Sequence, residues 1–196
     1  MGGGLMQLVA MGAQDVFLTG NPQITFFKVV YRRHTNFSKE CIKQDFNGSG
    51  ASLTCTLSRN GDLVQEIYLH GTSRANLTGD VTSQVVKTVE VEIGGQKIDK
   101  HYGAWLDIYN ELFETNHDYQ AAMCDGAGAA TSEVFIPLRF WFNRNPGLAL
   151  PLIALQYHEV KVLVEMQAND VLANADLLVN YVYLDTDERR RFAQVS

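Results

Sequence analysis

Apolar and polar side chains alternate over most of this chain, and a period of two residues is the signature of a half-buried β-strand. In residues 52–58, Leu53, Cys55 and Leu57 share one face while polar side chains take the other. The same alternation runs through 159–166, where the apolar positions 160, 162, 164 and 166 alternate with positions that include Glu159, Lys161 and Glu165. Because both faces cannot be buried by such a pattern, it predicts antiparallel sheets packed on one side. Further strands are predicted at 63–69, 89–93, 96–98, 134–142 and 177–184.

Turn residues separate these strands. Asn60–Gly61 lies between two of them, and both residue types tolerate the positive φ of a tight hairpin turn. Gly94–Gly95 is a second such site, with glycine at both central positions. Pro137 cannot donate a ladder hydrogen bond, so it marks an edge strand or a bulge.

One segment, 102–113, breaks the period of two. Trp105, Ile108, Tyr109 and Leu112 lie three or four residues apart with polar residues between them, which predicts an amphipathic helix in a connection outside the sheets. We expect its apolar stripe to pack on the core. Together the elements predict an antiparallel β-sandwich with one short helix, and periodicity alone does not separate an immunoglobulin-like sandwich from a jelly roll.

Composition reduces the number of function classes that fit this chain. The formal net charge is −6, whereas proteins that coat nucleic acid need clustered basic residues. No apolar run has the length of a membrane-spanning helix. The three cysteines and five histidines are dispersed without metal-ligand spacing. We therefore expect no enzymatic activity, no cofactor and no bound metal.

Three strings carry a resemblance to a known family. They are 12–37, which includes Gly20-Asn-Pro-Gln-Ile-Thr-Phe-Phe27, then 145–161 and 185–194. In this order they closely resemble the major capsid proteins of nucleocytoplasmic large double-stranded DNA viruses. The resemblance implies an eight-stranded viral jelly roll. It also implies a structural protein that self-assembles into trimeric capsomers of an icosahedral shell.

The family carries two jelly rolls in tandem, so this chain holds about half of a typical member. The resemblance divides it into an N-terminal arm at 1–30, a first jelly roll at 31–186 and the start of a linker at 187–196. Partners implied are two further copies in a homotrimer, neighbouring capsomers and minor capsid proteins, with no sequence-specific nucleic acid. The implied location is the virion capsid, with assembly in the host cytoplasm.

Apolar and basic residues outside the sandwich are the candidate assembly contacts. The arm offers apolar surface that needs a partner, and the basic residues at 32–33 leave open a contact with the genome or an inner viral membrane. An ion-paired strand end is the simpler interpretation of that basic pair. The candidate contacts are Ile24, Phe26, Phe27, Arg32, Arg33, Arg189, Arg190 and Arg191.

Three asparagines are candidate glycosylation sites. Asn36, Asn47 and Asn76 match the N-glycosylation pattern, although cytoplasmic assembly would leave them unmodified.

Two other functions remain as alternatives. A carbohydrate-binding jelly-roll module on the virion surface would need exposed aromatic side chains on loops, whereas Trp141 is expected on a strand and Trp105 on the helix. A cupin-like enzyme would need a cluster of histidine and carboxylate ligands, and the sequence has none.

Overall fold

The structure is a computed structural model that describes residues 12–13, 35–74, 78–114, 116, 118, 125–127, 133–169 and 171–195. The chain divides into two units, 1–34 and 35–196, and the second contains all the described strands and helices. The expected contacts in the arm and at 32–33 lie outside the described residues, as does Asn76.

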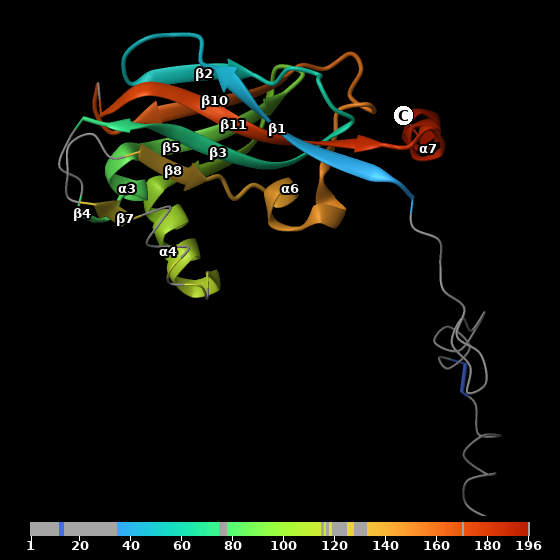
Figure 1. The fold of residues 1–196 in the computed structure, drawn as a ribbon, viewed down its shortest axis with the longest axis horizontal. Helices are drawn as coiled ribbons and strands as arrows, with labels where there is room; N and C mark the ends of the chain where they lie inside the picture. The colour runs from blue at the N-terminus through green and yellow to red at the C-terminus, as the bar shows by residue number, and fades with distance from the viewer. Residues whose placement is uncertain are drawn as a thin grey trace, which may run out of the picture. The chain divides into compact units, whose positions relative to one another are not determined.

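Two antiparallel sheets form the sandwich (Figure 1). The first has the strand order β1-β11-β3-β8, with β9 pairing on β3, and the second has the order β2-β10-β5-β6. The first contains β1 (Phe37–Asp45), β11 (Leu172–Leu184), β3 (Leu63–Ser73), β8 (Glu133–Pro137) and β9 (Leu150–Pro151). The second contains β2 (Ser52–Thr56), β10 (Val160–Met166), β5 (Val86–Ile93) and β6 (Gln96–Tyr102).

The path of the chain between the sheets is that of a jelly roll. The first three long strands alternate between the sheets, β5 and β6 form a hairpin, and β8, β10 and β11 alternate again. Each sheet therefore contains strands from both ends of the sequence, with β11 between β1 and β3, and β10 between β2 and β5. The predicted eight-stranded viral jelly roll is confirmed.

The core lies between the two sheets and is built by the alternation seen in the sequence. Along β10 the side chains at 160, 162, 164 and 166 are buried and those between them are half-buried. Val162 lies opposite Cys55 of β2 and Val91 of β5, and all three are fully buried. Burying apolar area in this way supplies most of the stabilisation of a sandwich, at about 25 cal/mol per Å².

The hairpin at Gly94–Gly95 is confirmed. Gly94 has φ 59° and Gly95 has φ 83°, the left-handed values that a primed turn requires at both positions. This turn joins β5 to β6, which pair from Ile93↔Gln96 onward.

The turn signal at Asn60–Gly61 does not mark a hairpin. The strands on either side, β2 and β3, belong to different sheets, and neither residue has a positive φ. Gly61 is required for another reason, because a Cβ there would lie 2.7 Å from the Cβ of Tyr181. The connection crosses the end of the sandwich and packs against β11.

The strand predicted at 134–142 ends early. β8 stops at Pro137, which lies on the edge strand as expected, and α6 (Trp141–Arg144) follows after a short connection. Phe140 and Phe142 are fully buried with ring centroids 5.8 Å apart. The alternation of aromatic residues therefore predicted correctly which side chains are buried, but it did not predict the backbone conformation.

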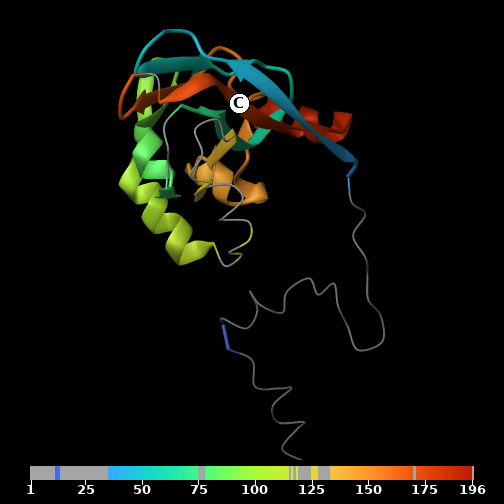
Figure 2. The ribbon, with the colours of Figure 1, turned by 60° about the vertical axis from the view of Figure 1, so that its left-hand side comes forward.

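Short helices lie outside the sheets. They are α3 (Thr82–Val85), α4 (Gly103–Phe113), α6, the 3₁₀ turn η1 (Pro146–Leu148) and α7 (Thr186–Val195), with a small β4–β7 pair (Thr78–Asp80 and Asp125–Ala127). The predicted helix corresponds to α4, which projects away from the sandwich (Figure 2). The sequence pattern did not predict the other helices. Among the described residues, no helix is long and apolar enough to cross a membrane.

Candidate functional site

The face that α4 buries only partly matches the apolar stripe expected from its sequence, because Trp105 packs against the core while other members of the stripe do not. Gly103, Leu106 and Asn110 are buried, and a Cβ at Gly103 would overlap the carbonyl oxygen of Val86. This close approach lets the helix pack directly on α3 and the start of β5. In contrast, Ile108 and Leu112 are 52% and 69% exposed.

Exposed apolar side chains continue on the strand before α4. Tyr102, at the end of β6, is 57% exposed, and Ile98 on the same strand is 51% exposed. Phe113 at the far end of α4 is 62% exposed. We call these five side chains the β6–α4 apolar surface: Ile98, Tyr102, Ile108, Leu112 and Phe113. Of these side chains, Ile108 and Leu112 are four residues apart and adjoin on the helix, and adjoining exposed apolar side chains are typical of an interaction site.

Charges on β5 and β6 hold the strand beside this surface. The carboxylate of Glu90 lies 2.6 Å from Lys97 Nζ and 2.7 Å from Lys100 Nζ. Hydrogen bonds from the two lysines lower the pKa of Glu90, and the bond from Lys100 has the larger effect. The ammonium of Lys100 also lies 5.5 Å from the centroid of the Tyr102 ring. The backbone ladder with β5 holds the edge strand, and these ion pairs, whose lysines are largely exposed, add to it.

Arg139 fixes the other end of α4. Its Nη2 lies 3.4 Å from both Asn110 Oδ1 and Glu114 Oε2, and its guanidinium carbon lies 5.3 Å from the centroid of the Tyr109 ring. These contacts join α4 to the segment after β8, so the helix is held at both ends.

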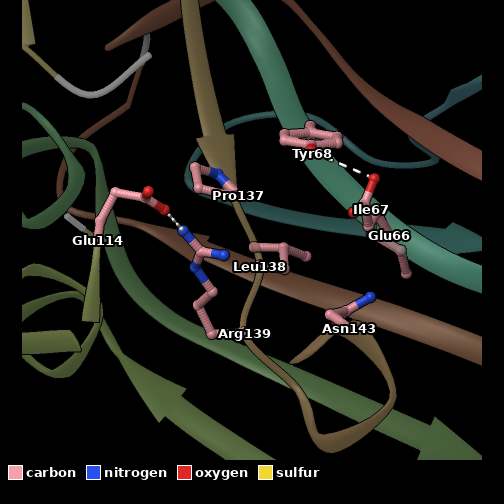
Figure 3. A pocket seen from close by; sticks show the side chains of 8 residues that line it. All are labelled: Glu66, Ile67, Tyr68, Glu114, Pro137, Leu138, Arg139 and Asn143. Atoms are coloured by element: carbon pink, nitrogen blue, oxygen red, sulfur yellow. Dashed lines mark hydrogen bonds and ion pairs between the residues drawn. The ribbon is translucent and has the colours of Figure 1, made fainter. Parts of the chain in front are cut away.

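A pocket of about 310 Å³ opens beside Arg139 (Figure 3). Across it, Glu66 accepts hydrogen bonds from Asn180 Nδ2 at 2.8 Å and from the Tyr68 hydroxyl at 3.4 Å. The pocket is thus lined by apolar residues, Ile67, Pro137 and Leu138, together with carboxylates that already have partners.

The three arginines predicted as assembly contacts lie on α7 and differ in their surroundings. Arg189 Nε lies 3.0 Å from Asp62 Oδ1 of the β2–β3 connection, so this side chain is used within the chain. Arg191 Nη1 lies 3.1 Å from Glu188 Oε1 on the same helix. Arg190 is exposed.

The described candidates for glycosylation lie on the surface. Asn36 is exposed just before β1, and Asn47 is exposed in the turn after it. The backbone of Asn47 is paired with Thr54 through hydrogen bonds of 2.7 and 3.0 Å. Both asparagines are therefore accessible from solvent.

The tryptophans do not form an exposed aromatic platform. Trp105 is half-buried with its ring centroid 5.9 Å from that of Tyr109. Trp141 lies on α6, not on a strand as predicted, and packs edge-on against Phe142 at 5.0 Å. Within the described part of the chain, no three histidine, cysteine or acidic side chains group as metal ligands.

Comparisons with known proteins agree with this architecture. The family model described as "Major capsid protein N-terminus" matches residues 25–185. The major capsid protein of Pyramimonas orientalis virus is 55% identical over 100% of this chain and 57% of its own length. That of Paramecium bursaria Chlorella virus 1 is 46% identical, over 100% of this chain and 51% of its own length.

Solved structures give the same result. The crystal structure of PBCV-1 VP54 superimposes with a TM-score of 0.71 and 40% identity, covering 87% of this chain and 48% of the other. The Faustovirus major capsid protein shares the fold, with a TM-score of 0.65 at 11% identity. The chain spans about half the length of the curated relatives it matches. By the extent of these matches, the chain belongs to the family of viral major capsid proteins and matches their N-terminal part.

Proposed function

We propose that this chain is the first jelly roll of a subunit that builds the capsid of a large double-stranded DNA virus. Family membership over the whole jelly roll supports this proposal. In the proposal, three subunits associate into a capsomer that contacts neighbouring capsomers and minor capsid proteins in the virion. Assembly takes place in the host cytoplasm.

The β6–α4 apolar surface is the observation that carries the proposal. Ile108 and Leu112 are exposed on a helix that is anchored on its opposite side by Gly103, Leu106 and Asn110. A helix fixed in this way cannot turn its apolar stripe inward, so the stripe gains stabilisation only when another surface covers it. In the proposal that cover is supplied by capsid subunits.

Sedimentation velocity on two proteins tests the proposal. One is this chain alone, and the other carries the remaining part of the Pyramimonas orientalis virus relative after Ser196. We expect concentration-dependent association of the first and discrete trimers of the second. A clean monomer of the first at high concentration, together with no trimer of the second, would contradict the proposal.

Paired variants connect the result to the helix. Ile108→Ser combined with Leu112→Ser should weaken the association of both proteins, because polar hydroxyls replace the exposed stripe. Tyr157→Ser is the matched control, since Tyr157 is 93% exposed in the loop before β10. If the control weakens association as much as the double variant does, the β6–α4 apolar surface has no special role.

A further inference from the structure

We infer that the ion pair between Asp62 and Arg189 is a latch that fixes the direction in which the chain leaves the sandwich. Asp62 lies in the connection between β2 and β3, far in sequence from α7. Its carboxylate contacts both the last residue of β11 and the first turns of α7, so one side chain controls the change from strand to helix.

The side chain of Asp62 joins the end of β11 to α7. Oδ2 accepts a hydrogen bond of 2.8 Å from the backbone N–H of Leu184, the last residue of β11. Oδ1 lies 3.0 Å from Arg189 Nε. The residue is 8% exposed, so a carboxylate without these partners would be costly there.

The backbone of the same residue is also bound on both sides. Asp62 N–H donates to the Val182 carbonyl oxygen at 3.1 Å, and the Asp62 carbonyl oxygen accepts from Ile153 N–H at 3.2 Å. The carboxylate is therefore held by the sandwich itself. It presents a fixed negative charge to the helix rather than moving with it.

The helix needs such a contact. α7 has ten residues, and an isolated helix of this length is marginal in water. Local contacts begin it: Asp185 Oδ1 accepts from Thr186 N–H at 2.7 Å, and the Asp185 carbonyl oxygen accepts from Arg189 N–H at 3.0 Å. These bonds start the helix, but only a contact with the sandwich sets where it lies.

Residues of α7 divide between two sides accordingly. Arg189 contacts the sandwich and Phe192, three residues later, is half-buried. Arg190 and Arg191 are exposed, and the side chain of Arg189 stays 57% exposed while it contacts Asp62. A spacing of three residues places 189 and 192 on one face of a helix, so the latch turns the remaining arginines toward solvent.

Limited digestion with trypsin measures the latch directly, because α7 carries three consecutive arginines. Cleavage inside a helix requires local unfolding. In this chain we expect Arg189→Gln to accelerate cleavage after Arg190 and Arg191 about five- to tenfold, the scale for losing a partly buried ion pair. The cleavage sites are identified by mass spectrometry, and the sandwich itself should stay resistant to trypsin, because the Asp62 carboxylate keeps its hydrogen bond from Leu184 N–H.

Three further proteins complete the test. Asp62→Asn removes the charge from the other side and should accelerate the same cleavages. Arg189→Lys should restore part of the protection, since an ammonium still reaches the carboxylate. Arg191→Gln is the control: it removes the pair within the helix, and cleavage after Arg190 should change less than about twofold because intrahelical pairs are weak.

Two outcomes would overturn the inference. One is a cleavage rate in Arg189→Gln equal to that of the unaltered chain. The other is an Asp62→Asn protein that is digested throughout the sandwich while Arg189→Gln stays protected, because Asp62 would then support only the sandwich. Both measurements use this chain alone, so they do not depend on capsid assembly.

Discussion

The backbone of Gly103 lies directly against the carbonyl oxygen of Val86, with no room for a side chain between them. This contact sets the first residue of α4 on the start of β5. It decides which face of the helix meets the sandwich, and therefore which face stays exposed.

Replacing Gly103 by alanine should destabilise the fold. The new Cβ would overlap the Val86 carbonyl oxygen and lie 3.0 Å from the Cα of Ser83. Overpacking of this kind costs about 1–3 kcal/mol, measured as a lower urea midpoint. Gly147→Ala is the control, because its Cβ would meet only Asn145 Oδ1 at 3.4 Å. Equal midpoints for the two variants would disprove the tight contact.

Truncation should destabilise the protein far more on the buried side of α4 than on the exposed side. Leu106 is 1% exposed, and Leu106→Ala should cost about 2–5 kcal/mol because it leaves a cavity. Leu112 is 69% exposed, and Leu112→Ala should change the free energy of unfolding by less than about 0.5 kcal/mol. Denaturant titration of dilute protein compares them. A larger loss from Leu112→Ala would mean that the apolar stripe faces the core after all.

Alkaline pH should destabilise the sandwich through Tyr181. Burial raises the pKa of this phenol above its usual value of 10.0, and the hydroxyl donates to the Ser58 carbonyl oxygen at 2.7 Å. Above about pH 10 the unfolded chain loses the proton while the folded chain keeps it, so the free energy of unfolding falls as the pH rises.

Thermal midpoints between pH 8 and pH 11 measure this fall, which should be smaller in Tyr181→Phe. At neutral pH that variant should lose about 1 kcal/mol with its hydrogen bond. Tyrosinate absorbance follows the titration independently. An unchanged pH slope in Tyr181→Phe would assign the fall to other groups, such as Tyr183, whose pKa is raised by its hydrogen bond to Glu40.

Mild acid should destabilise the fold through His101. Burial lowers the pKa of this imidazole below 6.5, and nearby Arg144 acts in the same direction, while Asp99 opposes them. The ring stacks on Phe140 with centroids 4.9 Å apart. Below about pH 6.5 the unfolded chain binds the proton more readily, so stability falls as the pH falls.

The change in thermal midpoint from pH 7.5 to pH 5.5 should therefore shrink in His101→Gln. His158→Gln serves as the control, because His158 is exposed and its replacement should leave the change intact. If both variants behave alike, His101 is not the group responsible.

Sequence patterns predicted the sandwich because burial on one face of a strand repeats every second residue, as Val162 and Val164 show. The same reasoning failed at α4, where Ile108 and Leu112 form a stripe that looks like a core-facing one. Nothing local reveals that Gly103 lets the opposite face approach the sheet. Periodicity predicts an amphipathic helix, but tertiary packing selects which face is covered.

The sequence pattern also does not predict contacts between residues that lie far apart in the chain. The run of arginines after residue 188 indicated a charge cluster, yet the pairing of Arg189 with Asp62 depends on the β2–β3 connection lying beside the end of β11. Likewise, the glycine at 61 was a turn signal by composition, whereas its role is to make space for Tyr181. Such roles follow from topology, which the local pattern does not contain.

The pairing of Phe37 with Leu184 places the first residue of β1 beside the last residue of β11 (Figure 1). The main chain thus enters and leaves the jelly roll at the same end, or pole, of the sandwich. A domain whose ends meet in this way tolerates duplication, because a second copy can be joined by a short connection without threading through the first. The opposite pole is not constrained in this way, and its loops can lengthen or diverge while the joined ends keep their geometry.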